Sequence, residues 1–263
     1  FNDPEGPSMY HYFHEVSYSL LTVNTHHYPT CDMDTNLSYQ DQYPRDYYKP
    51  YNENTNPDGY QNDNQAGARE HMLLKNAMEF VANDIPDDLD IDSNDDGYID
   101  NVTFLVSGAP TGWSDLLWPH RWALYTYDVY INGSRVYDYN LNLDQGGYFT
   151  VGTLCHEFFH SLGAPDLYHY YDDTAPTAVG GWDVMDASAD IPQSMSAFMK
   201  YQYTDWITSM PEVEYGGVYE INPLSSNENN IYRINSPLSN DEYFVVEYRV
   251  KEGLYEIILL EMI

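Results

Sequence analysis

The chain has 263 residues, of which 43% are hydrophobic, enough for one large folded domain or for a catalytic domain with a small appendage. Its 42 acidic and 10 basic side chains give a formal net charge of -32, so phosphate backbones and anionic membrane surfaces would be repelled. These values exclude a disordered chain and disfavour nucleic acid as a partner, and no apolar run approaches the roughly 18 residues that span a bilayer.

The first part of the chain combines a strand pattern, an irregular stretch and a helix. Residues 13–23 alternate apolar and polar side chains, which predicts a half-buried strand. Residues 24–65 are rich in Tyr, Asn, Asp and Pro, so we expect either an extended surface segment held by tyrosines or disorder. Residues 66–83 have helical spacing. The predicted apolar face of this helix consists of Leu73, Ala77, Phe80 and Val81.

Strand patterns follow in the middle of the chain. Residues 102–106 form a short apolar run, which predicts a buried strand. Asn132-Gly133 is a strong signal for a two-residue hairpin turn between strands at 125–131 and 134–141. We therefore expect these segments to build a sheet.

Two further helices are predicted. One runs over 148–162 and is ended by Gly163, and the other runs over 194–206 before Pro211.

The order of the elements favours an α+β fold. The tail from residue 215 onward is predicted to form short strands, and the apolar residues 257–260 are interpreted as a core strand. A break near Met210 would divide the chain into a domain over 1–210 and a β-rich C-terminal segment over 211–263.

Only two cysteines occur, Cys31 and Cys155, which excludes a disulfide-rich scaffold. The two residues can form one bridge or remain buried free thiols. Cys155 adjoins His156, but neighbouring helix positions point about 100° apart, so we expect its thiol to pack on the reverse face.

Residues 155–160, Cys-His-Glu-Phe-Phe-His, contain the pattern H-E-x-x-H within a predicted helix. Positions four apart share one helix face, so His156 and His160 can reach one ion. Neutral imidazole suits Zn²⁺, and a catalytic zinc site has three protein ligands and an open position for water. The spacing predicts such a site and requires a third ligand.

The predicted third ligand is Asp166, six residues after His160. Gly163 lies between them, and glycine readily adopts positive φ, so the chain can turn back toward the imidazoles. Glu157 is the predicted general base, since its carboxylate can accept a proton from an activated water and pass it to the leaving amine. The alternative is that these are ordinary residues of an amphipathic helix.

The run H-E-F-F-H-S-L-G-A-P-D-L-Y over 156–168 resembles the extended zinc motif of metzincin metallopeptidases. It is most similar to the immune inhibitor A type, in which an Asp takes the third-ligand place. Residues 181–186, Gly-Trp-Asp-Val-Met-Asp, resemble the Met-turn of that family. The resemblance implies that Met185 forms an apolar floor beneath the zinc, whereas by itself it would be an ordinary core methionine. Similarity continues in residues 15–18, 117–122 and 242–249.

This resemblance implies a zincin or metzincin-like catalytic domain with a twisted mixed sheet, a backing helix, an active-site helix, a Met-turn and a C-terminal helix, followed by a short β-rich tail. It also implies a secreted enzyme, made as a longer precursor with an N-terminal inhibitory pro-segment. Two departures stand out. Phe159 replaces a glycine of many members, and no tyrosine follows Met185 at the spacing that some metzincins use to stabilise the oxyanion.

Residues 92–100, Asp-Ser-Asn-Asp-Asp-Gly-Tyr-Ile-Asp, match the front of an EF-hand loop. The predicted Ca²⁺ ligands are the side chains of Asp92, Asn94, Asp96 and Asp100 and the backbone carbonyl of Tyr98. Thr103 stands in place of the usual glutamate, so further ligands must come from water or from Asp88 and Asp90. An acidic turn without an ion is the alternative. The family resemblance implies a structural calcium site.

Two functions follow from these observations. The first is a secreted zinc endopeptidase that hydrolyses protein or peptide substrates, with Glu157 as general base. The second is a catalytically silent, calcium-stabilised adhesion or glycan-binding module on the same fold. The complete H-E-x-x-H pattern and the downstream Asp166 favour the peptidase. His120 and Arg121 are not assigned to the site.

Overall fold

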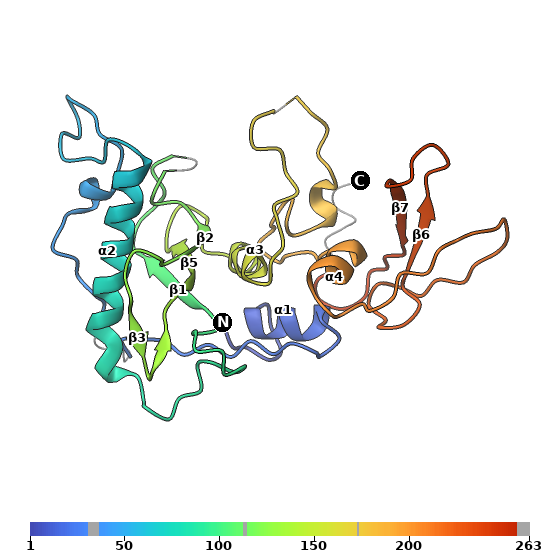
Figure 1. The fold of residues 1–263 in the computed structure, drawn as a ribbon, viewed down its shortest axis with the longest axis horizontal. Helices are drawn as coiled ribbons and strands as arrows, with labels where there is room; N and C mark the ends of the chain where they lie inside the picture. Colours follow the sequence, from blue (N-terminus) through green and yellow to red (C-terminus); the bar gives the residue numbers. More distant parts are fainter. Residues whose placement is uncertain (31–36, 113–114, 173, 257–263) are drawn as a thin grey trace. The chain divides into compact units, whose positions relative to one another are not determined.

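The computed structural model describes residues 1–30, 37–112, 115–172 and 174–256. Within them lie four α-helices, three short 3-10 helices and seven strands in three small sheets (Figure 1). This mixture confirms an α+β composition. The chain divides into two compact units, a first unit of Phe1–Thr25 with Thr150–Ile263 and a second unit of His26–Phe149. The predicted division at residue 210 stays a prediction.

The second unit is built on a three-stranded mixed sheet. Its strand order is β1 (Val102–Val106), β5 (Asp138–Leu143), β2 (His120–Ala123), with β1 parallel and β2 antiparallel to β5. The predicted hairpin turn is present, and Asn132 and Gly133 have φ of 49° and 94°, as a two-residue turn with two positive φ angles requires. The paired strands are shorter than the predicted 125–131 and 134–141, since they cover only Tyr130–Ile131 and Ser134–Arg135. The elements are η1 (Arg45–Tyr48), α2 (Asp63–Val81), η2 (Ala82–Asp84), β1 (Val102–Val106), β2 (His120–Ala123), β3 (Tyr130–Ile131), β4 (Ser134–Arg135) and β5 (Asp138–Leu143).

Helix α2 confirms the helix predicted over 66–83, but the predicted apolar face is only partly right, because Val81 is buried and Leu73 packs against a core cluster whereas Phe80 is exposed. Phe80 is 53% exposed, and its ring contacts Tyr39 with ring centroids 5.6 Å apart. Three buried side chains of α2 are instead spaced i, i+4 and i+7, namely Leu74, Met78 and Val81. Leu74 and Met78 belong to the core cluster that contains side chains of β5.

The irregular segment before α2 is held by tyrosines, as one of the two sequence interpretations expects. Tyr48 is buried, and its hydroxyl donates to Asp41 Oδ2 at 2.6 Å. The rings of Tyr43 and Tyr47 stack with centroids 4.1 Å apart. Cys31 lies outside the described residues.

The first unit contains the helix that carries the H-E-x-x-H pattern. Helices α3 and α4 confirm the predictions over 148–162 and 194–206, with shorter bounds, and β6 pairs with β7 antiparallel. The elements are α1 (Met9–Val16), α3 (Val151–Ser161), η3 (Gly180–Trp182), α4 (Ala197–Tyr203), β6 (Ile231–Asn235) and β7 (Tyr243–Glu247). The core strand predicted at 257–260 lies outside the described residues.

The strand predicted over 13–23 is wrong, because the chain forms helix α1 up to Val16. Ser8 caps this helix, since its side chain accepts a hydrogen bond from the His11 backbone N–H at 3.0 Å. The alternation that suggested a strand ends at Leu20, which is 66% exposed. The buried side chains of α1 follow helical spacing instead and are Met9, Tyr12, Phe13 and Val16.

The core of the first unit joins α1, α3 and the segment around Met185. Cys155 is a free, buried cysteine in this core. Phe159 is also fully buried, and its ring stacks on Trp206 with centroids 6.0 Å apart and planes at 13°. In the described part of the chain, we find no helix with the length and apolar character needed to cross a membrane.

Candidate metal centre

Helix α3 places the two motif histidines on one face. It begins after Thr150, whose hydroxyl accepts a hydrogen bond from the Thr153 backbone N–H at 3.0 Å. The rings of His156 and His160 have centroids 4.9 Å apart and nearly perpendicular planes, at 88°. Leu154, Cys155 and Phe159 of the same helix lie in the core. Core packing therefore directs the two imidazoles away from the buried side of the helix.

Gly163 turns the chain back toward these imidazoles. Its φ is 100°, and its N–H donates to the His160 carbonyl at 2.9 Å. Asp166 Oδ1 then lies 2.9 Å from His156 Nε2 and 3.4 Å from His160 Nε2. The structure thus brings the three predicted zinc ligands together, with potential ligand atoms within 4.8 Å of one another.

Backbone carbonyls determine which ring nitrogens carry hydrogen. His156 Nδ1 lies 2.8 Å from the Val184 carbonyl oxygen, and His160 Nδ1 lies 2.7 Å from the Ala164 carbonyl oxygen. Because a carbonyl only accepts, Nδ1 is the donor in each ring, and a neutral ring then has its lone pair on Nε2. Both Nε2 atoms therefore offer lone pairs to a common point.

Asp166 Oδ1 occupies the same point, and no hydrogen bond from the described residues reaches this buried atom. Three lone pairs that face one another at these distances repel unless positive charge lies between them. A proton on one imidazole or a metal ion would supply that charge.

The electrostatics of the site favour a cation. Burial lowers the pKa of His156, but the carboxylates of Asp166 and Glu157 and the Val184 carbonyl outweigh burial, so its pKa is raised. Burial raises the pKa of Asp166, but the two imidazoles and the Tyr170 hydroxyl outweigh it and hold the pKa well below its usual value. Glu157 is buried directly beside His156.

The predicted Met-turn lies against this centre. Met185 is fully buried, and its N–H donates to Asp183 Oδ1 at 2.9 Å. Its carbonyl accepts from the Leu167 N–H at 2.9 Å, one residue after Asp166. Val184, the residue before Met185, orients His156. The segment is therefore hydrogen-bonded to two of the three predicted ligand regions.

Two tyrosines, Tyr168 and Tyr170, contact the predicted ligands, and the sequence alone assigned neither of them to the site. The Tyr170 hydroxyl donates to Asp166 Oδ2. The Tyr168 ring stacks beside His156, with centroids 6.3 Å apart and planes at 19°. Burial raises the pKa of both tyrosines, and the Asp166 carboxylate adds to the rise. The sequence signals were the place of Tyr168 at the end of the run that resembles the zinc motif and the position of Tyr170 four residues after Asp166.

The predicted calcium loop lies in the second unit, and its side-chain oxygens accept hydrogen bonds from backbone N–H groups of the same loop. Asp92 accepts hydrogen bonds from the N–H groups of Asp96 and Gly97, at 3.0 and 2.9 Å, and Gly97 has φ of 84°. Asn94 Oδ1 accepts from the Asp96 N–H at 3.1 Å, while Asp96 and Asp100 accept from the N–H groups of Tyr98 and Ser93. Among the described residues, the group of His, Cys, Asp or Glu side chains that lie close enough to hold a metal ion consists of His156, His160 and Asp166, and it does not include this loop. Calcium binding by this loop stays a prediction.

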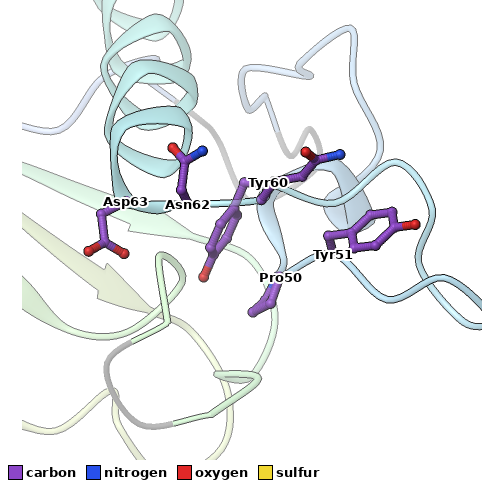
Figure 2. Close-up of a pocket in the computed structure, with 6 residues that line it drawn as sticks. Pro50, Tyr51, Tyr60, Asn62 and Asp63 are labelled. Carbon is purple, nitrogen blue, oxygen red and sulfur yellow. The ribbon is translucent and has the colours of Figure 1, made fainter.

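His120 and Arg121 have structural partners within the second unit. His120 Nε2 lies 2.8 Å from Glu70 Oε1, and Arg121 forms an ion pair with Asp138. A depression at the start of α2 is lined by Pro50, Tyr51, Tyr60, Gln61, Asn62 and Asp63 (Figure 2). None of the predicted site residues lines this depression.

Comparison of the chain with protein-family models and with curated proteins finds no match.

Proposed function

We propose that this chain is a zinc-dependent endopeptidase of the immune inhibitor A type, with His156, His160 and Asp166 as zinc ligands and Glu157 as general base. One observation carries the proposal. Two imidazole Nε2 atoms converge, at 2.9 and 3.4 Å, on a buried carboxylate oxygen that receives no hydrogen bond from the described residues.

The donor set suits zinc better than a hard cation. Two neutral imidazoles and one carboxylate are a common ligand set of catalytic zinc, which keeps a fourth position open. Calcium and magnesium prefer sites made of oxygen atoms alone. Histidine ligands of metals usually donate their other N–H to a carbonyl or carboxylate, as His156 and His160 do to Val184 and Ala164.

Hydrolysis of a peptide bond would proceed with the following roles. When bound, zinc supplies Lewis acidity toward a water molecule and the substrate carbonyl. Glu157 accepts a proton from the attacking water and delivers it to the leaving nitrogen as the C–N bond breaks. The carbonyls of Val184 and Ala164 keep the two imidazoles in the tautomer that presents Nε2.

The remaining parts of the proposal follow from the same family resemblance. We propose a metzincin-like fold, a secreted enzyme with an inhibitory pro-segment, a protein or peptide substrate and a structural Ca²⁺ at residues 92–100. The burial of Met185 within a segment that is bonded to His156 supports its role as an apolar floor.

The test uses the purified full chain and its Glu157→Gln variant. We expect about one zinc per chain by metal analysis in both proteins, and chelator-sensitive cleavage of a denatured protein only in the wild type. Zinc-loaded Glu157→Gln with unchanged cleavage would contradict the general base. A wild-type chain that takes up no zinc and binds glycans would replace the peptidase with the adhesion module.

A further inference from the structure

We propose that Tyr170 is a positioning residue of the metal centre, whose hydroxyl holds Asp166 Oδ2 so that only Oδ1 faces the ion. This inference deepens the proposed zinc site and depends on it. The inference concerns how the carboxylate of Asp166, the proposed third ligand, binds the ion. Neither the H-E-x-x-H pattern nor the Met-turn contains a residue that would decide this.

The two oxygens of Asp166 have different surroundings. Oδ1 lies near both Nε2 atoms, at 2.9 Å from His156 and 3.4 Å from His160, and receives no hydrogen bond from the described residues. Oδ2 accepts a hydrogen bond from the Tyr170 hydroxyl. A carboxylate can bind a metal through one oxygen or two. With Oδ2 engaged by a donor, binding through Oδ1 alone is favoured.

Aromatic contacts hold the Tyr170 hydroxyl in this place. The rings of Tyr170 and Tyr168 meet edge to face, with centroids 5.2 Å apart and planes at 63°, and Tyr168 stacks beside His156. The Leu167 N–H bonds to the Met185 carbonyl at 2.9 Å, which anchors the chain just before the pair. Tyr170 thus contacts both Asp166 and Tyr168 even though the residue is 47% exposed.

The consequence for chemistry is an open coordination position. A catalytic zinc needs a site for water beside its three protein ligands. An Asp166 carboxylate that binds through both oxygens would compete with water for that site. Outer partners of metal ligands also set ligand basicity and orientation, and their loss typically reduces metal affinity or activity about 10- to 100-fold.

The experiment compares Tyr170→Phe with Tyr171→Phe in the full chain. Tyr171 is the adjacent tyrosine and is 96% exposed, with its ring centroid 6.1 Å from that of Tyr170, so its variant removes the same chemical group from a residue other than the one that donates to Asp166 Oδ2. Each protein is loaded with Co²⁺ to record its visible absorption, because band position and intensity follow coordination geometry. Zinc affinity is measured by competition with a chelator.

For Tyr170→Phe we expect weaker visible bands, as a higher coordination number produces, and a loss of zinc affinity of about tenfold or more. Tyr171→Phe should match the wild type in both. If Tyr170→Phe has the wild-type spectrum and affinity, the positioning role is overturned while the zinc site stands. If the wild type takes up neither Co²⁺ nor Zn²⁺, both proposals fail. A changed Tyr170→Phe spectrum in a chain that cleaves no protein would support the positioning role and overturn only the peptidase.

Discussion

His156 Nδ1 lies 2.8 Å from the carbonyl oxygen of Val184, 28 residues further along the chain. This contact fixes the tautomer of the first motif histidine from outside its own helix. The residue that follows, Met185, is buried in the core and bonds through its carbonyl to the N–H next to Asp166. Structural changes in this segment should therefore alter the positions of His156 and Asp166 in the candidate metal centre.

Asp183→Ala should destabilise the first unit strongly. The buried carboxylate of Asp183 accepts hydrogen bonds from the N–H groups of Met185 and Ser196, at 2.9 and 2.7 Å. Its removal leaves two buried donors without acceptors, which costs about 1–3 kcal/mol for each group. Urea unfolding measures the loss. Asp183→Asn keeps one acceptor oxygen and should lose less, and equal stability of the two variants would contradict this account.

Gly152→Ala should also destabilise the protein, because the N-terminal turn of α3 packs tightly against backbone. An added Cβ would lie 1.8 Å from the Ala189 carbonyl oxygen, a contact that no side-chain rearrangement relieves. We expect a loss of roughly 3 kcal/mol in the free energy of unfolding. Gly216→Ala is the control, since no described atom lies within 4 Å of its added Cβ. Similar unfolding curves for both variants would show that the close approach is absent in solution.

The lowered pKa of buried Lys200 predicts that the free energy of unfolding rises with pH. The side chain is buried, with Nζ 3.4 Å from the Tyr18 hydroxyl and 4.6 Å from the centroid of its ring. Burial lowers the pKa of Lys200 to about 7, and Arg249 acts in the same direction against the opposing carboxylates of Glu256 and Glu247.

Between about pH 7 and the ordinary lysine pKa of 10.5, the unfolded chain holds the proton that folded Lys200 has released. The free energy of unfolding therefore gains a contribution that increases with pH in this window, by at most about 1.4 kcal/mol per pH unit. Lys200→Met should lose this contribution. Unfolding free energies of both proteins from pH 6 to 10 give the difference, and parallel curves would refute the lowered pKa.

Calcium should stabilise the second unit through the loop over 92–100. Four aspartates and one asparagine occur within these nine residues, and a cation relieves the mutual repulsion of the carboxylates. We expect Ca²⁺ to raise the melting temperature of the wild type without changing its zinc content. Asp96→Ala should abolish the rise, whereas exposed Glu53→Gln should retain it. A Ca²⁺ effect that persists in Asp96→Ala would indicate general screening of the acidic surface.

Much of the candidate centre was predictable from sequence because its parts are local. Four-residue spacing places His156 and His160 on one helix face, and a glycine at positive φ can reverse the chain toward Asp166. Strand β1, the Asn132-Gly133 turn and helices α2, α3 and α4 were predictable for the same reason, since each depends on a pattern within a few neighbouring residues.

Tertiary structure decided what neighbouring residues leave open. Residues up to Val16 form a helix rather than a strand because the buried side chains of α1 pack in the core of the first unit. Phe80 faces outward because Leu74 and Met78 pack in the core cluster that contains side chains of β5. The Val184 carbonyl as partner of His156 likewise depends on folding. Short polar and apolar patterns fit more than one period, and hydrogen bonds across 28 residues have no local signature, so only packing selects them.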